Sequence, residues 1–100
     1  MINFNIPPYV GTELNYIKQA VENKKICGDG EFTKKCNAWM EDKFNAQKVL
    51  LTTSGTTALE MAMLLSGFGP GDEVILPSYT FSSTATSVVL TGATLVFVDI

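Results

Sequence analysis

Apolar side chains in the first half of the chain recur at helical intervals and predict two helices. The first should begin near Thr12, which is a good N-cap residue, and end at Asn23-Lys24-Lys25. Its apolar positions are Leu14, Ile17 and Val21. The second should begin near Glu31, and its apolar positions are Phe32, Cys36, Trp39, Met40 and Phe44. Between the two helices, Cys27-Gly28-Asp29-Gly30 has the composition of a turn.

In the second half, short apolar runs alternate with helical patterns. Strands are predicted at Lys48–Thr52, Glu73–Pro77 and Thr94–Val98. Helices are predicted from Thr56 to about Leu65 and from Ser82 to Leu90. The strands lack a strict polar and apolar alternation, as expected when both faces of a sheet are covered. This order indicates an α/β fold, with a mainly parallel sheet and crossover helices.

Composition and charge narrow the classes of function. Apolar residues make up 46% of the chain and charged residues 17%, which is typical of a globular protein. The net charge of −3 gives no general attraction to nucleic acid or to an anionic membrane. Because the sequence has no histidine, these residues cannot provide histidine base catalysis or a histidine-ligated zinc site, and we expect no metal site.

Cysteine usage and hydropathy indicate the compartment. Cys27 and Cys36 lack the CxxC spacing of redox and metal motifs, and we expect reduced thiols. The longest apolar run is far shorter than the roughly 20 residues that span a bilayer. We therefore expect a soluble, cytoplasmic protein.

The segment Ser54-Gly55-Thr56-Thr57 joins a predicted strand to a predicted helix. A glycine-containing turn at a helix N-terminus offers free N–H groups and the positive end of the helix dipole to an anion. No lysine follows the glycine as in a Walker loop, and there is no GxGxxG pattern, so a single phosphate fits better than a polyphosphate. An ordinary capped helix start explains the same residues about equally well.

A second loop, from Pro77 to Thr84, also follows a strand and precedes a helix. Ligands of open α/β sheets gather outside the carboxyl ends of the strands, so this loop and the Ser54 turn should face one crevice. The loop contains Tyr79 and Phe81, which are either part of the core or platforms for a flat ring. Spacing alone favours core packing.

Six segments in one order resemble the N-terminal part of the DegT/StrS family of sugar-nucleotide aminotransferases. They are Pro8 to Glu13, Cys27 to Gly30, Ser54 to Leu59, Pro70 to Ile75, Pro77 to Phe81 and Gly92 to Asp99. Members of this family are pyridoxal-phosphate (PLP) enzymes of fold type I, and the resemblance covers essentially the whole chain. It implies the N-terminal segment of a large cofactor-binding domain. Residues 1–47 would form an arm and two helices, and residues 48–100 would begin the cofactor-binding sheet.

The resemblance also assigns roles to residues. It implies that Ser54, Gly55, Thr56 and Thr57 hold the phosphate of pyridoxal 5'-phosphate and that Phe81, rather than Tyr79, stacks on the pyridine ring. Gly28 and Asp29 would lie near the sugar nucleotide, although a simple helix–helix turn explains them equally well. None of the seven lysines matches the family's Schiff-base lysine, which we expect beyond Ile100 together with the acidic partner of the ring nitrogen. No catalytic residue is therefore expected in these residues.

The activity implied is transfer of an amino group from an amino acid, with glutamate expected, to a 4-keto-6-deoxy sugar nucleotide for bacterial cell-surface polysaccharide. Within the family, the likeness is to enzymes that act on a dTDP-linked sugar in enterobacterial common antigen assembly. A homodimer is also implied. Two alternatives stay open: a PLP-dependent sugar dehydratase, with histidine in place of the lysine, and a non-catalytic phosphate-binding module.

Overall fold

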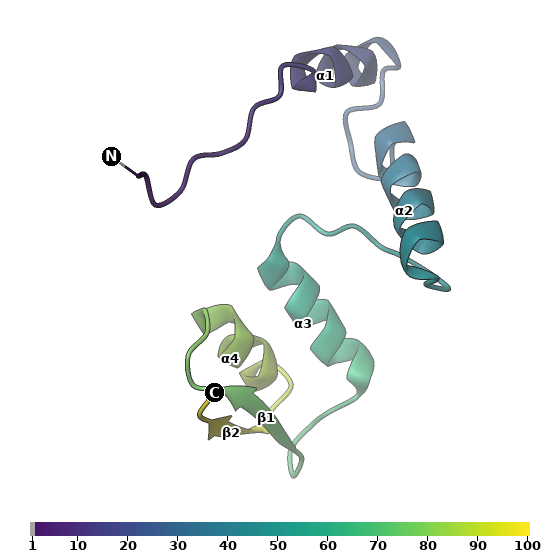
Figure 1. Ribbon diagram of the computed structural model, residues 1–100. Coiled ribbons are helices and arrows are strands. Elements are labelled where there is room, and N and C mark those ends of the chain that lie inside the picture. The colour runs from purple at the N-terminus through teal and green to yellow at the C-terminus, as the bar shows by residue number, and fades with distance from the viewer. Residues whose placement is uncertain (1) are drawn as a thin grey trace. The chain divides into compact units, whose positions relative to one another are not determined.

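The computed structural model describes residues 2–100, which form two compact units. The first unit ends at Leu50, and the second comprises Leu51–Ile100. The first unit contains two helices, α1 (Glu13–Glu22) and α2 (Glu31–Phe44) (Figure 1). The elements of the second unit are α3 (Gly55–Ser66), β1 (Glu73–Pro77), α4 (Ser82–Val89) and β2 (Thr94–Val98). All four predicted helices and two of the three predicted strands are confirmed.

Side chains at the ends of α1 and α2 join the two helices. The ring of Tyr16 contacts that of Phe32 edge to face, with 5.5 Å between the centroids. The Asn23 side-chain amide donates a hydrogen bond of 2.9 Å to the carboxylate of Glu31. The Lys35 ammonium pairs with the same carboxylate and lies 5.3 Å from the centroid of the Phe32 ring. An aromatic contact and one hydrogen bond therefore join the two helices, whereas the Lys35 contacts lie within α2.

The predicted N-cap of α1 does not make a side-chain capping bond. Thr12 has a helical backbone conformation, and its side chain makes no hydrogen bond to the first turn. Instead, the Glu13 carboxylate accepts the N–H groups of Val10 at 2.8 Å and Gly11 at 2.9 Å. The bond from Val10 is the main reason why the pKa of Glu13 lies below the ordinary 4.5. The helix start is held by a carboxylate in its first turn, where negative charge is favoured by the helix dipole.

The strand predicted at Lys48–Thr52 is wrong. This segment has no ladder partner among residues 2–100, and a strand is stabilised by hydrogen bonds to a neighbouring strand. Its beginning is held by α2 instead: the Glu41 carboxylate accepts the N–H of Val49 at 3.0 Å and lies 3.4 Å from the Lys48 ammonium. The apolar residues of this segment are typical of a strand, but the described residues contain no neighbouring strand with which it could pair.

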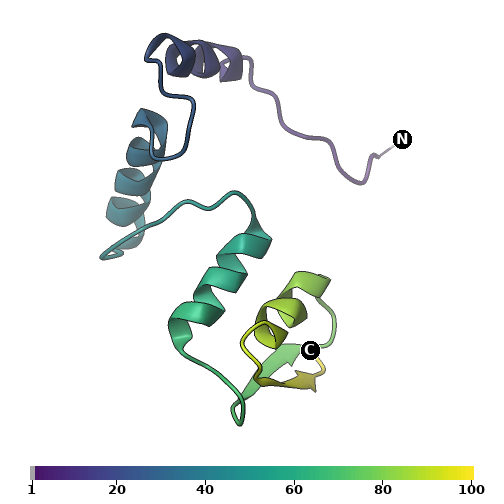
Figure 2. The same ribbon diagram turned by 180° about the vertical axis from the view of Figure 1, so that it is seen from behind.

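The second unit is a β-α-β arrangement with one further helix. β1 and β2 are parallel neighbours, in register from Glu73 opposite Thr94 to Pro77 opposite Val98. Helix α4 connects them and packs on the sheet, and α3 packs against α4 (Figures 1 and 2). This parallel pair with its crossover helix confirms the predicted α/β class.

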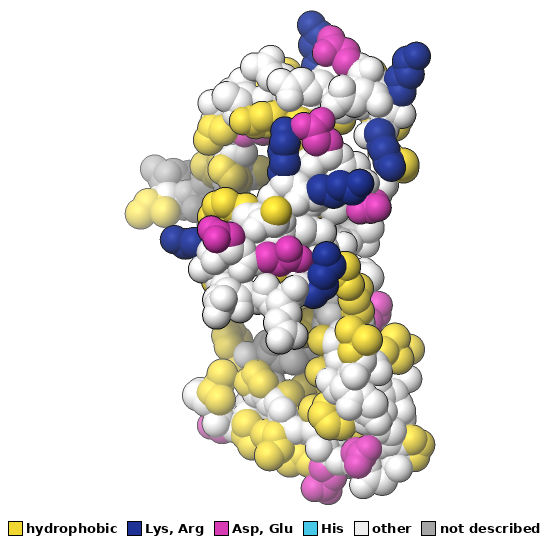
Figure 3. Space-filling view, turned by 90° about the vertical axis from the view of Figure 1, so that its right-hand side faces the viewer, with side chains coloured by type: hydrophobic (Ala, Val, Ile, Leu, Met, Phe, Trp, Pro, Cys, Tyr) yellow, Lys and Arg dark blue, Asp and Glu magenta, His cyan; other side chains and the backbone are white. Residues whose placement is uncertain are grey.

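One face of this sheet carries the core of the unit. Leu76, Val88 and Ala93 are buried, together with the small polar residues Ser83 and Ser87 of α4. On the opposite face of the sheet from Leu76, Ile75 is 70% exposed. The expectation that both faces are covered is therefore not met within residues 2–100. Figure 3 shows basic side chains gathered on the first unit, in agreement with the sequence, where no lysine or arginine follows Lys48.

Two further observations concern membranes and metals. No helix among residues 2–100 has both the length and the apolar character required to cross a membrane. Within the same residues, no three side chains of histidine, cysteine, aspartate or glutamate come together as metal ligands. Cys27 and Cys36 are exposed free thiols.

Candidate functional site

Ser54 is the N-cap residue of α3 and makes both the side-chain and the backbone capping bonds. Its backbone is extended, with φ −160° and ψ 163°. The Ser54 hydroxyl accepts the N–H of Thr57 at 3.1 Å, and the Ser54 carbonyl accepts the N–H of Ala58 at 3.1 Å. Serine is preferred at this position because its oxygen satisfies one of the free donors of the first turn.

Two backbone donors remain free at this helix start. Within residues 2–100, the N–H groups of Gly55 and Thr56 have no hydrogen-bond partner, and neither does the Thr56 hydroxyl. The Thr57 hydroxyl, in contrast, lies 3.0 Å from the Ser54 hydroxyl. The four predicted phosphate ligands therefore divide into a cap formed by Ser54 and Thr57 and a set of unpaired donors on Gly55 and Thr56.

Gly55 leaves open space at this position. A Cβ atom added to Gly55 would meet no atom within 4 Å. The packing of residues 2–100 therefore does not require a glycine here, whereas close approach of a ligand to the backbone does. Unpaired N–H groups, a free hydroxyl, a helix dipole and open space together fit a phosphate group.

The aromatic side chains of the second loop are exposed. Phe81 is the N-cap residue of α4, with an extended backbone, and is 74% exposed, and Tyr79 is 90% exposed. Residue spacing alone favoured packing of these two rings in the core, and this prediction is wrong within residues 2–100. An exposed ring at the start of a helix is available to stack on a planar ligand.

The fold brings the Ser54 turn and Phe81 to the same end of the second unit. Helices α3 and α4 pack against each other, and both views show that they begin at the same end (Figures 1 and 2). Because Ser54 and Phe81 are the N-caps of these helices, both loops lie at that end. The Phe81 loop follows β1, as expected for a loop at the carboxyl end of a parallel strand, whereas the Ser54 turn follows no strand among residues 2–100.

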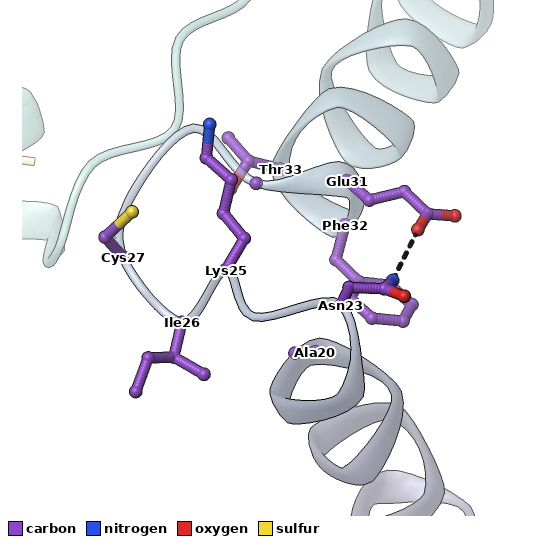
Figure 4. A pocket seen from close by; sticks show the side chains of 9 residues that line it. Ala20, Asn23, Lys25, Ile26, Cys27, Glu31, Phe32 and Thr33 are labelled. Atoms are coloured by element: carbon purple, nitrogen blue, oxygen red, sulfur yellow. Dashed lines mark hydrogen bonds between the residues drawn. The ribbon is translucent and has the colours of Figure 1, made fainter.

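A cleft of about 500 Å³ lies in the first unit, near the two predicted substrate residues. It is formed by the end of α1, the following loop and the start of α2 (Figure 4). Cys27 and Gly30 line it, whereas Gly28 and Asp29 do not. Asp29 has a left-handed backbone, with φ +58°, so Gly28-Asp29 forms a sharp bend beside the cleft. A role of these two residues in substrate binding stays a prediction.

The Glu31 carboxylate at this cleft is already paired. The Lys35 ammonium, and then the Asn23 amide, hold the pKa of Glu31 below the ordinary 4.5. Figure 4 shows Asn23, at the end of α1, reaching Glu31 at the start of α2. The carboxylate therefore joins the two helices.

Sequence reasoning missed one residue of the α3 turn. The Thr52 hydroxyl donates a hydrogen bond of 2.8 Å to the Ser54 carbonyl. Hydroxyl side chains often bond to backbone two residues away, so a threonine two positions before a helix N-cap was a usable signal.

Comparison with known proteins places this chain in a family. The model of the DegT/DnrJ/EryC1/StrS aminotransferase family matches residues 9–100. The GDP-perosamine synthase of Caulobacter vibrioides is 36% identical over 98 residues, which cover 98% of this chain and 26% of that protein. These residues therefore span about a quarter of the length of that relative.

Solved structures agree with this likeness. Spr1654 of Streptococcus pneumoniae, described as a sugar aminotransferase and solved in a PMP-form and a PLP-form, matches with a TM-score of 0.84 at 29% identity. The match covers 99% of this chain and 25% of that chain. The GDP-4-keto-6-deoxy-D-mannose-3-dehydratase of E. coli, with bound hydrated PLP, matches with a TM-score of 0.82 at 25% identity over 100% of this chain and 28% of that chain. With a family model that extends over nearly all its residues, this chain belongs to the DegT/DnrJ/EryC1/StrS aminotransferase family.

Proposed function

We propose that the full-length protein is a PLP-dependent aminotransferase that transfers an amino group to a 4-keto-6-deoxy sugar nucleotide for bacterial cell-surface polysaccharide. The observation that carries the proposal is the start of α3, where Gly55 and Thr56 present N–H groups that have no partner among residues 2–100. Phe81 is exposed at the same end of the unit. A phosphate site beside an aromatic ring suits a phosphorylated aromatic cofactor.

In this proposal, each residue of the turn has a defined task. The backbone of Gly55 and Thr56 and the Thr56 hydroxyl bind the cofactor phosphate, and Phe81 covers one face of its ring. Ser54 and Thr57 maintain the helix start that orients these donors. The cofactor supplies the electron sink for amino transfer. The Schiff-base lysine and the partner of the ring nitrogen belong to the rest of the protein.

The direct test uses the purified full-length protein. Its cofactor absorbance should change when glutamate alone is added, because amino transfer proceeds in two half-reactions. The original absorbance should return when a 4-keto-6-deoxy sugar nucleotide is added, and an aminated sugar nucleotide should form. The GDP-perosamine synthase relative is a reason to assay GDP-linked and dTDP-linked sugars side by side. A protein that binds PLP but aminates no sugar nucleotide contradicts the proposal.

A sugar dehydratase is the second candidate, because the E. coli GDP-4-keto-6-deoxy-D-mannose-3-dehydratase matches this whole chain. The same assay separates the two reactions. A dehydratase would consume the sugar nucleotide and release a deoxygenated sugar that has not gained nitrogen. A histidine at the position of the Schiff-base lysine would favour it. A non-catalytic phosphate-binding module would consume no sugar nucleotide at all.

The homodimer belongs to this proposal as well. Its mass should be twice that of one chain in size-exclusion chromatography with light scattering. A monomer that retains full activity contradicts it.

A further inference from the structure

The Ser54 carbonyl at the start of α3 accepts two hydrogen bonds. The Ala58 N–H donates to it at 3.1 Å, as the first bond of the helix, and the Thr52 hydroxyl donates at 2.8 Å. A carbonyl oxygen has two lone pairs, so both are used. Thr52 is half-buried, and within residues 2–100 its hydroxyl makes this one hydrogen bond, to the Ser54 carbonyl.

The Ser54 carbonyl and the Gly55 N–H belong to one peptide group. A peptide group is planar and trans, so its carbonyl and N–H point in opposite directions. Two hydrogen bonds that fix the Ser54 carbonyl therefore fix the direction of the Gly55 N–H as well. This N–H is one of the two backbone donors of the proposed phosphate site that are unpaired within the described part of the chain.

This peptide group needs such a restraint because it precedes a glycine. Glycine has more backbone freedom than any other residue. Apart from its chain neighbours and the backbone of its own helix, no atom lies within 4 Å of the place where a Gly55 Cβ would be, so packing against other segments of residues 2–100 does not restrain it. The helix bond from Ala58 restrains the carbonyl, and Thr52 adds a second restraint.

We infer that Thr52 is a positioning residue, which holds the Gly55 N–H in the direction of the cofactor phosphate. The inference rests on the proposed function, since it concerns the phosphate site of that function. Thr52 itself does not touch the phosphate. Its contribution is preorganisation: a donor that is already oriented loses less freedom when the ligand binds.

The test compares two ligands on the full-length apo-protein, pyridoxal phosphate and pyridoxal, which lacks the phosphate. Thr52→Val and Thr52→Ala remove the hydroxyl, whereas Thr52→Ser retains it. Thr53→Val is the matched control, because the Thr53 hydroxyl lies 3.4 Å from the Thr57 hydroxyl and does not contact the Ser54 carbonyl. Apparent dissociation constants are measured by fluorescence titration.

Loss of one hydrogen bond should weaken pyridoxal phosphate binding roughly fivefold in Thr52→Val and Thr52→Ala. Pyridoxal binding should stay unchanged, and Thr52→Ser and Thr53→Val should bind both ligands like the wild type. In the apo-protein, NMR relaxation should show a more mobile Gly55 amide in the hydroxyl-free variants.

Three results would overturn the inference alone. The first is unchanged pyridoxal phosphate binding in the hydroxyl-free variants. The second is an equal loss of affinity for pyridoxal phosphate and pyridoxal. The third is an unchanged mobility of the Gly55 amide in these variants. A wild-type protein that binds neither ligand would instead remove the proposed function, and the role of Thr52 with it.

Discussion

The Glu41 carboxylate on α2 accepts the backbone N–H of Val49 at 3.0 Å, eight residues further along the chain. This bond is the main cause of the lowered pKa of Glu41, followed by the charge of Lys48 3.4 Å away. Sequence patterns had predicted a strand at this position. The chain leaving α2 is therefore attached to a side chain of that helix rather than to a neighbouring strand.

The first prediction concerns the pH dependence of this bond. The pKa of Glu41 is lower in the folded protein than the ordinary value of 4.5. The bond therefore stabilises the folded state fully at pH values above 4.5. That stability is lost as the pH falls through the lowered pKa. The Val49 amide resonance should shift in the same acidic range. Glu41→Gln keeps the acceptor but not the titration, so a Val49 shift that persists in this variant would contradict the assignment.

The second prediction concerns the Ser54 cap. Ser54→Ala removes the acceptor of the Thr57 N–H and should lower the free energy of unfolding of the full-length protein by about 1 kcal/mol. Ser54→Gly should cost only a few tenths of a kcal/mol, because glycine leaves the helix end open to water. Denaturant unfolding of both variants measures this. Equal losses in the two variants would show that the hydroxyl does not act as a cap.

The third prediction separates the two threonines of the turn. The Thr56 hydroxyl is unpaired within residues 2–100, whereas the Thr57 hydroxyl contacts Ser54 at 3.0 Å. Thr56→Val should weaken pyridoxal phosphate binding about tenfold or more, because it removes a hydrogen bond to a charged group. It should hardly change thermal stability, whereas Thr57→Val should lower it. Full cofactor affinity in Thr56→Val would remove this side chain from the site.

The fourth prediction uses the two aromatic residues of the second loop. Both are exposed, so replacing either by alanine should cost little stability. Phe81→Ala should weaken cofactor binding roughly 3- to 10-fold, which is the scale of a lost aromatic contact. Tyr79→Ala is the matched control and should leave binding unchanged. The reverse result would place the ring platform at Tyr79.

The fifth prediction tests the turn between α4 and β2. Gly92 has φ +82°, and a Cβ there would lie 3.2 Å from Pro70 Cγ. Gly92→Ala should destabilise the protein by about 1 to 2 kcal/mol from the left-handed backbone alone. Gly69→Ala is the control, because a Cβ at Gly69 meets no atom within 4 Å. Similar melting temperatures for the two variants would contradict this role of Gly92.

Local sequence was sufficient for the elements whose stabilising contacts are local. Helical spacing of apolar residues correctly predicted α1, from Leu14, Ile17 and Val21, and likewise α2. Such a prediction works because a helix forms its backbone hydrogen bonds within itself. The turn at Ser54 could also be recognised in advance, since an N-cap depends on residues three or four positions apart.

Tertiary structure decided what depends on a distant partner. A strand needs a neighbour, so the run at Lys48–Thr52 could not become one among residues 2–100. Exposure also depends on what packs nearby, which is why spacing wrongly favoured a buried Phe81.

The sequence by itself determined the helices, the parallel β-α-β order and the capped turn at Ser54, because each depends on neighbours in the chain. Only the tertiary structure decided that Glu41 holds Val49 and that α3 and α4 begin at one end. The reason is physical: these relationships depend on distances and directions in space, which the periodicity of residue types does not specify.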